Sequence, residues 1–134
     1  MFRDAFVNLY TGDIEAGVRF YRDLLGFVET FRTPTEGTPE HVELMLNGFG
    51  LGLGTVEAAK RVHGVDTSPG SPAMVLVVWT SDVDAAFDRM VSAGTPVVQP
   101  PHDTGTRNRN ALLRDPDGNL VEIVQLLSGR STTS

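Results

Sequence analysis

The segments DIEAGVRFYRDLLG (residues 13–26) and DVDAAFDRMVSAG (residues 82–94) decide the fold, because one helical pattern occurs twice in a chain of only 134 residues. In each segment the apolar side chains recur at the spacing of one helix face: Ile14, Val18, Tyr21 and Leu25 in the first, and Val83, Phe87 and Met90 in the second. Each segment is therefore predicted to form an amphipathic helix, and the molecule to be a doubled unit.

Both predicted helices carry matching start and stop signals. Asp13 and Asp82 precede the apolar faces, where a carboxylate caps free backbone N–H groups at the positive end of the helix dipole. Gly26 and Gly94 follow the last turns, where a residue in the left-handed conformation commonly ends a helix. The start, the apolar face and the stop therefore agree in both copies.

The sequence around the helices is typical of strands. Apolar runs lie between turn signals at 5–10, 27–31, 41–46 and 49–56 in the first half, and at 73–80, 96–99, 111–114 and 120–126 in the second. Two turns join neighbouring runs: Asn47-Gly48, the strongest short hairpin signal, and Asp115-Pro116-Asp117-Gly118. Each half is therefore predicted to be β-α-β-β-β, and the fold class to be α+β.

A single domain accounts for the predicted order of elements: module 1 (1–56), a linker (57–71), module 2 (72–127) and a polar tail (128–134) that we expect to be frayed. The linker combines a short helical stretch with Pro, Gly and Ser. One helix cannot cover both faces of a four-stranded sheet. Two modules side by side, or two chains, would therefore form a curved sheet around a cleft.

Composition excludes several functional classes. A hydrophobic fraction of 40% and a charged fraction of 21% indicate an ordinary globular protein, and the absence of cysteine excludes disulfides and thiolate metal sites. No signal peptide or membrane-spanning run is visible, so we expect a cytoplasmic protein with no membrane partner. The net charge of −6 argues against nucleic acid and mildly favours neutral or cationic partners.

The doubled module resembles the vicinal oxygen chelate superfamily, which contains glyoxalase I, extradiol dioxygenases and bleomycin-resistance binding proteins. The resemblance is carried by Asp13-Ile14-Glu15, by Phe20-Tyr21 with the following Leu24-Leu25-Gly26-Phe27, and above all by Asp115-Pro116-Asp117-Gly118-Asn119 leading to Glu122. It implies two tandem modules that form a cupped mixed sheet, subunits that dimerise, and, in the enzymes, one divalent metal held by side chains from four strands.

Of the four metal-ligand positions that the resemblance implies, only one carries a donor side chain in this chain. Glu122 occupies the last position, four residues after the glycine of the turn. Phe6 occupies the first, the strand 50–54 (Gly-Leu-Gly-Leu-Gly) offers no donor for the second, and Met74 and Val75 stand near the third. The histidines, His41, His63 and His102, lie elsewhere in the sequence. We therefore expect no metal and no other cofactor, and a divalent metal is the alternative.

Glu122 is the only candidate catalytic residue. One hypothesis is that it faces the cleft without metal and is kept ionised by Arg107 or Arg109 in the preceding loop, since a buried unpaired carboxylate is costly. The alternatives are that Glu122 is a structural hydrogen-bonding group and that the arginines belong to a solvated loop.

Two further features have both functional and structural interpretations. Gly48, Gly50, Gly52 and Gly54 alternate, which does not match a dinucleotide loop; one face of this strand is then bare backbone, either open to a ligand or tightly packed. Trp79 would stack on a planar ligand or belong to a core or interface.

The sequence therefore favours a glyoxalase/bleomycin-resistance-like, metal-free homodimer that binds a small organic molecule, a drug or metabolite, in a cleft. The residues expected to line that cleft are Phe6, Asn8, Tyr10, Trp79, Arg107, Arg109 and Glu122. The alternatives are a metal-dependent lyase, isomerase or dioxygenase of the same superfamily, a metal-free enzyme with Glu122 as general base, and a domain that serves only in assembly.

Overall fold

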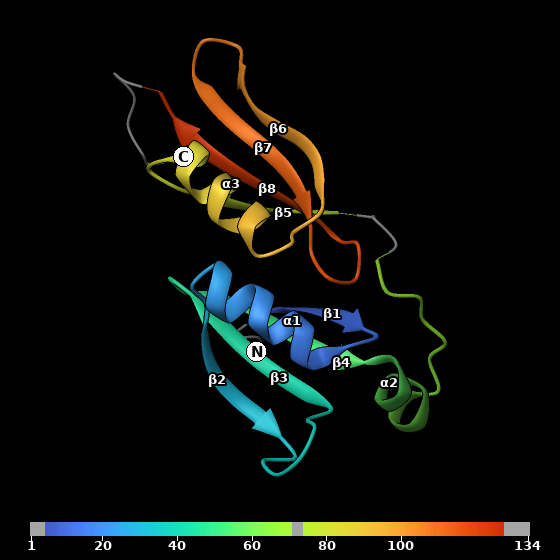
Figure 1. Ribbon diagram of the computed structural model, residues 1–134. Coiled ribbons are helices and arrows are strands. Elements are labelled where there is room, and N and C mark those ends of the chain that lie inside the picture. Colours follow the sequence, from blue (N-terminus) through green and yellow to red (C-terminus); the bar gives the residue numbers. More distant parts are fainter. Residues whose placement is uncertain (1–4, 71–73, 128–134) are drawn as a thin grey trace. The chain divides into compact units, whose positions relative to one another are not determined.

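The computed structural model describes residues 5–70 and 74–127, so the tail predicted to be frayed (128–134) lies outside the described residues. The chain forms two compact units, residues 1–71 and 72–134 (Figure 1). The first contains β1 (Val7–Thr11), α1 (Ile14–Val18), η1 (Arg19–Leu24), β2 (Val28–Thr33), β3 (His41–Leu46), β4 (Phe49–Thr55) and α2 (Val56–His63). The second contains β5 (Val75–Trp79), α3 (Val83–Ser92), β6 (Val97–Thr104), β7 (Asn108–Arg114) and β8 (Leu120–Leu126).

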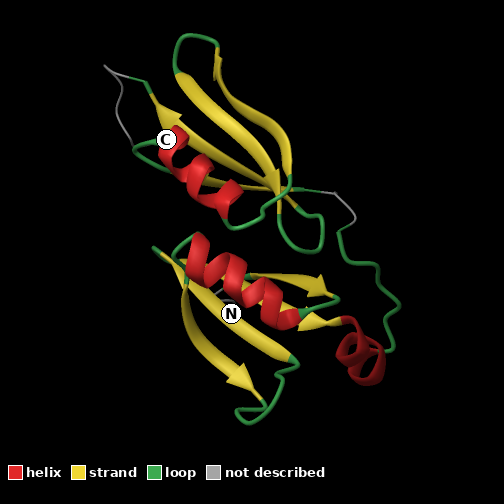
Figure 2. Cartoon of the chain, in the orientation of Figure 1, coloured by secondary structure: helices red, strands yellow, loops and turns green. Residues whose placement is uncertain are grey.

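The two units repeat one strand order. The first sheet runs β1-β4-β3-β2 and the second β5-β8-β7-β6, with the first strand of each unit parallel to its neighbour and the other pairs antiparallel. Each sheet carries its own amphipathic helix, α1 with η1 or α3 (Figure 2). The predicted α+β fold of two β-α-β-β-β modules is therefore confirmed.

The first helix begins as predicted and then changes its winding. Asp13 caps it, because its side chain accepts a hydrogen bond from the backbone N–H of Ala16 at 3.1 Å. After Val18 the hydrogen bonds span five residues, so η1 is a π-helix that continues α1 without a break. Gly17 lets this helix approach the sheet closely, since an added Cβ would lie 3.1 Å from Leu53 Cδ1.

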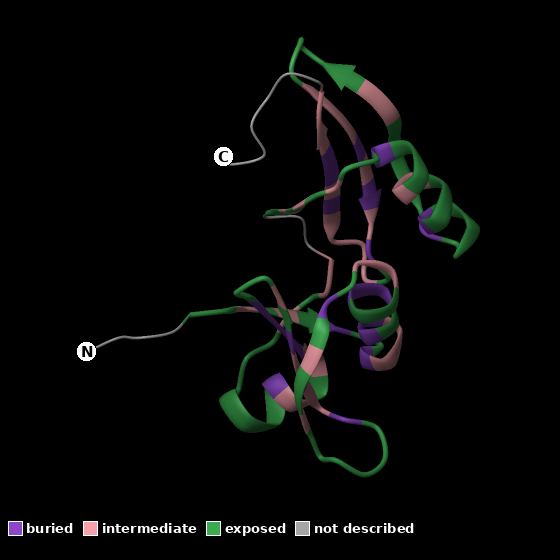
Figure 3. Ribbon diagram, turned by 90° about the vertical axis from the view of Figure 1, so that its left-hand side faces the viewer, coloured by how far each residue is buried: buried purple, intermediate pink, exposed green. Residues whose placement is uncertain are grey.

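Side chains that alternate along the strands form the two cores. Beneath the first helix, Tyr21 packs edge-on against Phe20 and Phe27, above the strand residues Val42, Leu44, Leu51 and Leu53, all buried. Beneath α3 the buried set is Val83, Met90, Ala111, Leu113, Val121 and Ile123. Figure 3 shows buried and exposed segments alternating along both helices, as expected when one face of each contacts a sheet.

The turns between strands have the predicted chemistry. Asn47 and Gly48 both have positive φ, 47° and 87°, which is the conformation of a two-residue hairpin turn. In the second turn the buried Asp115 accepts hydrogen bonds at Oδ1 from the backbone N–H groups of Asp117 and Asn119, at 2.9 and 2.8 Å. Both turns therefore fix the register of the strands that follow them.

Two strands of the second unit are longer than the sequence indicates. β6 extends to Thr104 and β7 begins at Asn108, so His102 lies in a strand, whereas the sequence predicts a loop there. β6 is one of the two edge strands of its sheet, and its pairing is interrupted between Gln99 and His102, around Pro100-Pro101. An edge position and a bulge are where a strand tolerates proline. Among the described residues, no helix is long and apolar enough to cross a membrane.

Candidate functional site

Each sheet has one face covered by its helix and one open face, and the predicted site residues are divided between the two units. Phe6, Asn8 and Tyr10 alternate with the helix-facing Val7 and Leu9, so all three side chains belong to the open face of the first sheet. Phe6 is 49% exposed and Tyr10 is 37% exposed. The first strand therefore presents two aromatic rings on this open face.

A pocket of about 530 Å³ lies on the open face of the first sheet. It is lined by Ala5, Phe6, Thr30, Glu43, Leu44, Met45, Gly48, Gly50 and Leu51. Its volume falls in the range of small-molecule sites, and its lining combines the apolar side chains of Phe6 and Met45 with the polar side chains of Thr30 and Glu43. Phe6 is the only residue of the predicted cleft that lines this pocket.

Among the residues that the structure describes, Glu43 is the only ionisable one that lines this pocket, and no sequence motif singles it out. Its Oε2 lies 2.9 Å from His41 Nε2, and its backbone carbonyl accepts a hydrogen bond from Thr30 Oγ1 at 3.3 Å. The alternation of HVELML places His41, Glu43 and Met45 on one face, so the pattern that predicts this strand could also have identified Glu43.

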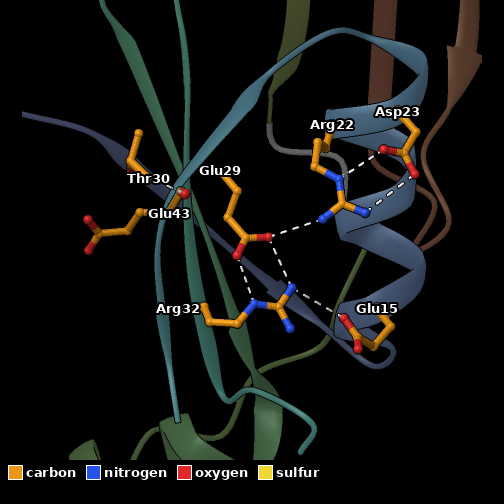
Figure 4. A network of polar contacts seen from close by, with 7 residues as sticks. All are labelled: Glu15, Arg22, Asp23, Glu29, Thr30, Arg32 and Glu43. Atoms are coloured by element: carbon orange, nitrogen blue, oxygen red, sulfur yellow. Dashed lines mark hydrogen bonds and ion pairs between the residues drawn. The ribbon is translucent and has the colours of Figure 1, made fainter. Parts of the chain in front are cut away.

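The opposite side of β2 carries a separate ion-pair network. Glu29 accepts hydrogen bonds from Arg32 Nε at 2.8 Å and from Arg22 Nη1 at 3.3 Å, and Arg32 reaches Glu15 at 3.7 Å. The hydrogen bond from Arg32 is the main cause that holds the pKa of Glu29 below its usual value. Figure 4 shows Glu43 pointing away from this network. Arg22 and Arg32 therefore pair with Glu29 on the helix side of the sheet and do not contact Glu43.

The glycines of β4 are covered by side chains of the neighbouring strand. A Cβ added to Gly50 would lie 2.7 Å from Phe6 Cβ, and one added to Gly52 would overlap Asn8 Oδ1 and approach Phe6 Cε2 at 3.1 Å. Gly54 is different, since only His41 Nδ1 comes as near as 4.0 Å. The glycine face of β4 is therefore tightly packed at Gly50 and Gly52, because the side chains of Phe6 and Asn8 cover it there.

In the second unit Glu122 lies on the open face and is bound by a neutral amide. Glu122 pairs in register with Val77 and Leu112, whereas the buried Val121 and Ile123 face α3. Asn110 Nδ2 donates a hydrogen bond to Glu122 Oε2 at 2.8 Å, and Thr104 Oγ1 donates to Asn110 Oδ1. A hydrogen-bonded row therefore crosses three strands of this face. Trp79 belongs to the same face and is 48% exposed.

The expected pairing of Glu122 with Arg109 is wrong. Arg109 binds Asp84 in the first turn of α3, with contacts of 2.8 and 2.9 Å, and Asp103 on β6 at 3.1 Å. These bonds raise the pKa of Arg109 and hold the pKa of Asp84 below its usual value. Arg109 is one residue before Asn110, so its side chain points to the helix side and leaves the predicted cleft.

Arg107 does not take the place of Arg109. It is exposed in the turn between β6 and β7, where its carbonyl accepts a hydrogen bond from the backbone N–H of Leu127 at 2.9 Å. Within residues 5–70 and 74–127 neither Arg107 nor any other cation forms an ion pair with Glu122. The partner of Glu122 is therefore Asn110, an amide that sequence reasoning missed.

The metal of the superfamily's enzymes does not fit the residues present. Gly52 and Glu122 are equivalent in the two units, because they pair in register with Asn8 and Val77, each five residues before a helix-capping aspartate. Gly52 has no side chain that could donate to a metal. Nowhere in the described part of the chain do three His, Asp or Glu side chains gather as a metal site requires.

Paired β-α-β-β-β modules with an open, partly apolar sheet face define a recognised class of proteins. The sequence profile of the Glyoxalase/Bleomycin resistance protein/Dioxygenase superfamily matches residues 5–123. The chain therefore belongs to this superfamily, which agrees with the resemblance carried by its motifs.

Three individual relatives place the chain more closely. It is 29% identical to CFP32 of Mycobacterium tuberculosis, provisionally named a glyoxylase, over 90% of this chain but only 44% of that protein, so it spans less than half of this relative. A glyoxalase-related enzyme from Fulvimarina pelagi has a TM-score of 0.75 and 28% identity, covering 92% of this chain and 88% of the other. TnmS3, an antibiotic binding protein from Streptomyces sp. CB03234, has a TM-score of 0.68 and 25% identity, covering 95% and 98%.

Proposed function

We propose that this protein is a metal-free binding protein that takes up a small organic molecule, a drug or metabolite. The observation that carries the proposal is the pocket of about 530 Å³ on the open face of the first sheet, with Phe6 and Met45 among its apolar side chains. The proposed working form is a cytoplasmic homodimer, with no nucleic-acid or membrane partner and no cofactor.

The chemistry of both open faces supports binding over activation of water. The first face offers Phe6, Tyr10 and a carboxylate, and the second offers Trp79 beside an amide-bound Glu122. Aromatic rings next to a few polar groups suit an organic ligand. The antibiotic binding protein TnmS3 supports the same function. In this proposal the binding residues are Phe6, Asn8 and Tyr10 in the first unit and Trp79, Arg107 and Glu122 in the second, and Arg109 is no longer included.

The test is calorimetric titration with a panel of planar organic compounds, together with quenching of the fluorescence of Trp79, the only tryptophan. We expect saturable binding by at least one compound and at least tenfold weaker binding after Phe6→Ala. The control is Val91→Ala, which shortens an exposed side chain of α3 and should leave affinity unchanged. Absence of binding across the panel would contradict the proposal and favour a role in assembly.

The second candidate is an enzyme, and the observation that favours it is the carboxylate of Glu122 on an open sheet face. A metal-free enzyme would use Glu122 as general base, and the glyoxalase-related enzyme from Fulvimarina pelagi supports this alternative. A metal-dependent lyase, isomerase or dioxygenase would need donors that these residues do not supply.

Calorimetric titration of chelator-treated protein with zinc, nickel, manganese and, anaerobically, ferrous ion separates the metal-free and metal-dependent candidates. We expect no stoichiometric tight binding, because Glu122 alone cannot hold a divalent ion. Tight binding at one ion per chain would contradict the assignment of ligand positions and would favour a metal-dependent enzyme.

A further inference from the structure

We infer that the ligand of the first unit is an organic cation, an amine or quaternary ammonium group on an apolar planar body, and that Glu43 is its counter-ion. The inference rests on the proposed function and names the chemical class of the ligand. It is carried by the position of one carboxylate between two phenyl rings on the open face of the first sheet.

The two rings flank Glu43 on neighbouring strands. Glu43 pairs in register with Phe31 of β2 on one side and with Gly52 of β4 on the other. Because Gly52 has no side chain, the ring of Phe6 occupies the space above it, with Cε2 3.1 Å from where a Cβ would stand. Phe31 and Phe6 are each 49% exposed, so both rings are accessible.

This arrangement matches what organic cations require. A cation is attracted to the face of an aromatic ring, and aromatic surroundings with an acidic group are a common way to bind quaternary ammonium groups. A neutral ligand would gain only from the rings and from Met45, and would leave the carboxylate without a cation in a partly apolar pocket. The pocket therefore favours a positive charge on the ligand.

Among the described residues, no arginine or lysine neutralises the negative charge of Glu43. Its carboxylate contacts His41 through Oε2, and neither oxygen forms an ion pair with any Arg or Lys in the described part of the chain. Arg22 and Arg32 lie on the other face of β2, where Glu29 binds them (Figure 4). Tyr10 and His41 are the other titratable groups on the described open face, and the net charge of −6 adds a long-range attraction for cations.

The experiment compares two probes of nearly equal shape, phenyltrimethylammonium and the neutral tert-butylbenzene, by NMR titration of the full chain. We expect the wild-type protein to bind the cation at least tenfold more tightly than the neutral probe. In Glu43→Gln the preference should fall below threefold while the affinity for the neutral probe stays the same. Glu36→Gln removes the same charge from an exposed loop and should retain the preference, which separates a local contact from the overall field.

A second variant tests the rings without changing any charge. Phe31→Leu keeps an apolar side chain at an exposed position and should weaken binding of the cation at least threefold, with a smaller effect on the neutral probe. Equal binding of both probes by the wild type, or an unchanged preference in Glu43→Gln, would overturn the inference and leave the proposed function standing. Binding of neither probe, nor of any compound in the planar panel, would instead contradict the proposed function.

Discussion

Asn110 donates a hydrogen bond from Nδ2 to Oε2 of Glu122 across neighbouring strands, at 2.8 Å. A carboxylate at this position is a metal ligand in the enzymes that the chain resembles, and here a neutral amide from the next strand binds it. The amide oxygen of Asn110 in turn accepts from Thr104. The hydrogen bonds of this row therefore all run in one direction, from Thr104 to Asn110 and from Asn110 to Glu122.

Replacing the amide donor of Asn110 by a carboxylate should lower the stability of the protein. Asn110→Asp places a second carboxylate next to Glu122, and the free energy of unfolding should fall by about 1–3 kcal/mol, because a hydrogen bond is replaced by repulsion between like charges. The double variant Asn110→Asp/Glu122→Gln restores one donor and one acceptor and should recover most of the loss. Urea denaturation at neutral pH measures all three proteins. Equal stability of the single and double variants would show that the contact contributes nothing.

The glycines of β4 should differ in their tolerance of a methyl group. Gly52→Ala would overlap the side chain of Asn8 and should destabilise the protein by about 1–3 kcal/mol. Gly54→Ala meets only His41 at 4.0 Å and should be neutral or stabilise by up to about 1 kcal/mol, because alanine reduces the entropy of the unfolded chain. Thermal unfolding of the two variants gives the comparison. A result in the opposite order would contradict the packing of Asn8 over Gly52.

The buried side chain of Asp115 should be the most sensitive position of its turn. Asp115→Ala removes the acceptor of two backbone N–H groups and of Asn119 Nδ2, and should cost about 2–4 kcal/mol. Asp115→Asn can keep Oδ1 as an acceptor, so its cost should be smaller. Denaturant unfolding tests this order, and an alanine variant as stable as the asparagine variant would contradict it.

The ion pair of Glu29 and Arg32 should contribute stability that depends on pH. The folded protein holds the pKa of Glu29 below the ordinary value of 4.5, so the contribution is present above that value and is lost as the pH falls through the lower, folded value. Arg32→Gln should therefore destabilise by about 0.5–1 kcal/mol at pH 7 and by less in acid. Urea unfolding at several pH values checks this, with Arg107→Gln as the control. A cost that does not shrink in acid would argue against an electrostatic origin.

The sequence predicts the fold well where local signals and burial agree. Asp13 and Asp82 cap helices as expected, and β3 and β8 have the predicted bounds. It predicts less where a strand lies at an edge or exposes polar residues: the proline pair in β6 and the asparagines at the start of β7 have loop chemistry but pair as strands. The π-helical winding of Arg19–Leu24 has no signal in the apolar spacing.

The candidate site is predictable only in part. Alternate residues of a strand point to opposite faces of the sheet, so an error of one position changes which side chains meet. The turn motif identifies Glu122, but the partner of Glu122 differs by one position from the expected residue, since Asn110 rather than Arg109 lies on the same face. Glu43 escapes prediction because no motif marks it. Glu43 becomes important through the strand register, which places Phe31 on one side of it and, on the other, the ring of Phe6 above Gly52.

The cover that Asn8 and Phe6 form over β4 constrains how this protein can change. An acid at position 52 would reproduce in the first unit what Glu122 provides in the second, but Asn8 already occupies the space for its Cβ. A substitution at Gly52 therefore destabilises the protein unless the side chain of Asn8 becomes smaller or moves at the same time. A donor at position 52 thus requires a coupled change at Asn8, and the position held by Phe6 would still lack a donor, so several substitutions without benefit alone separate the present chemistry from that of a metal site.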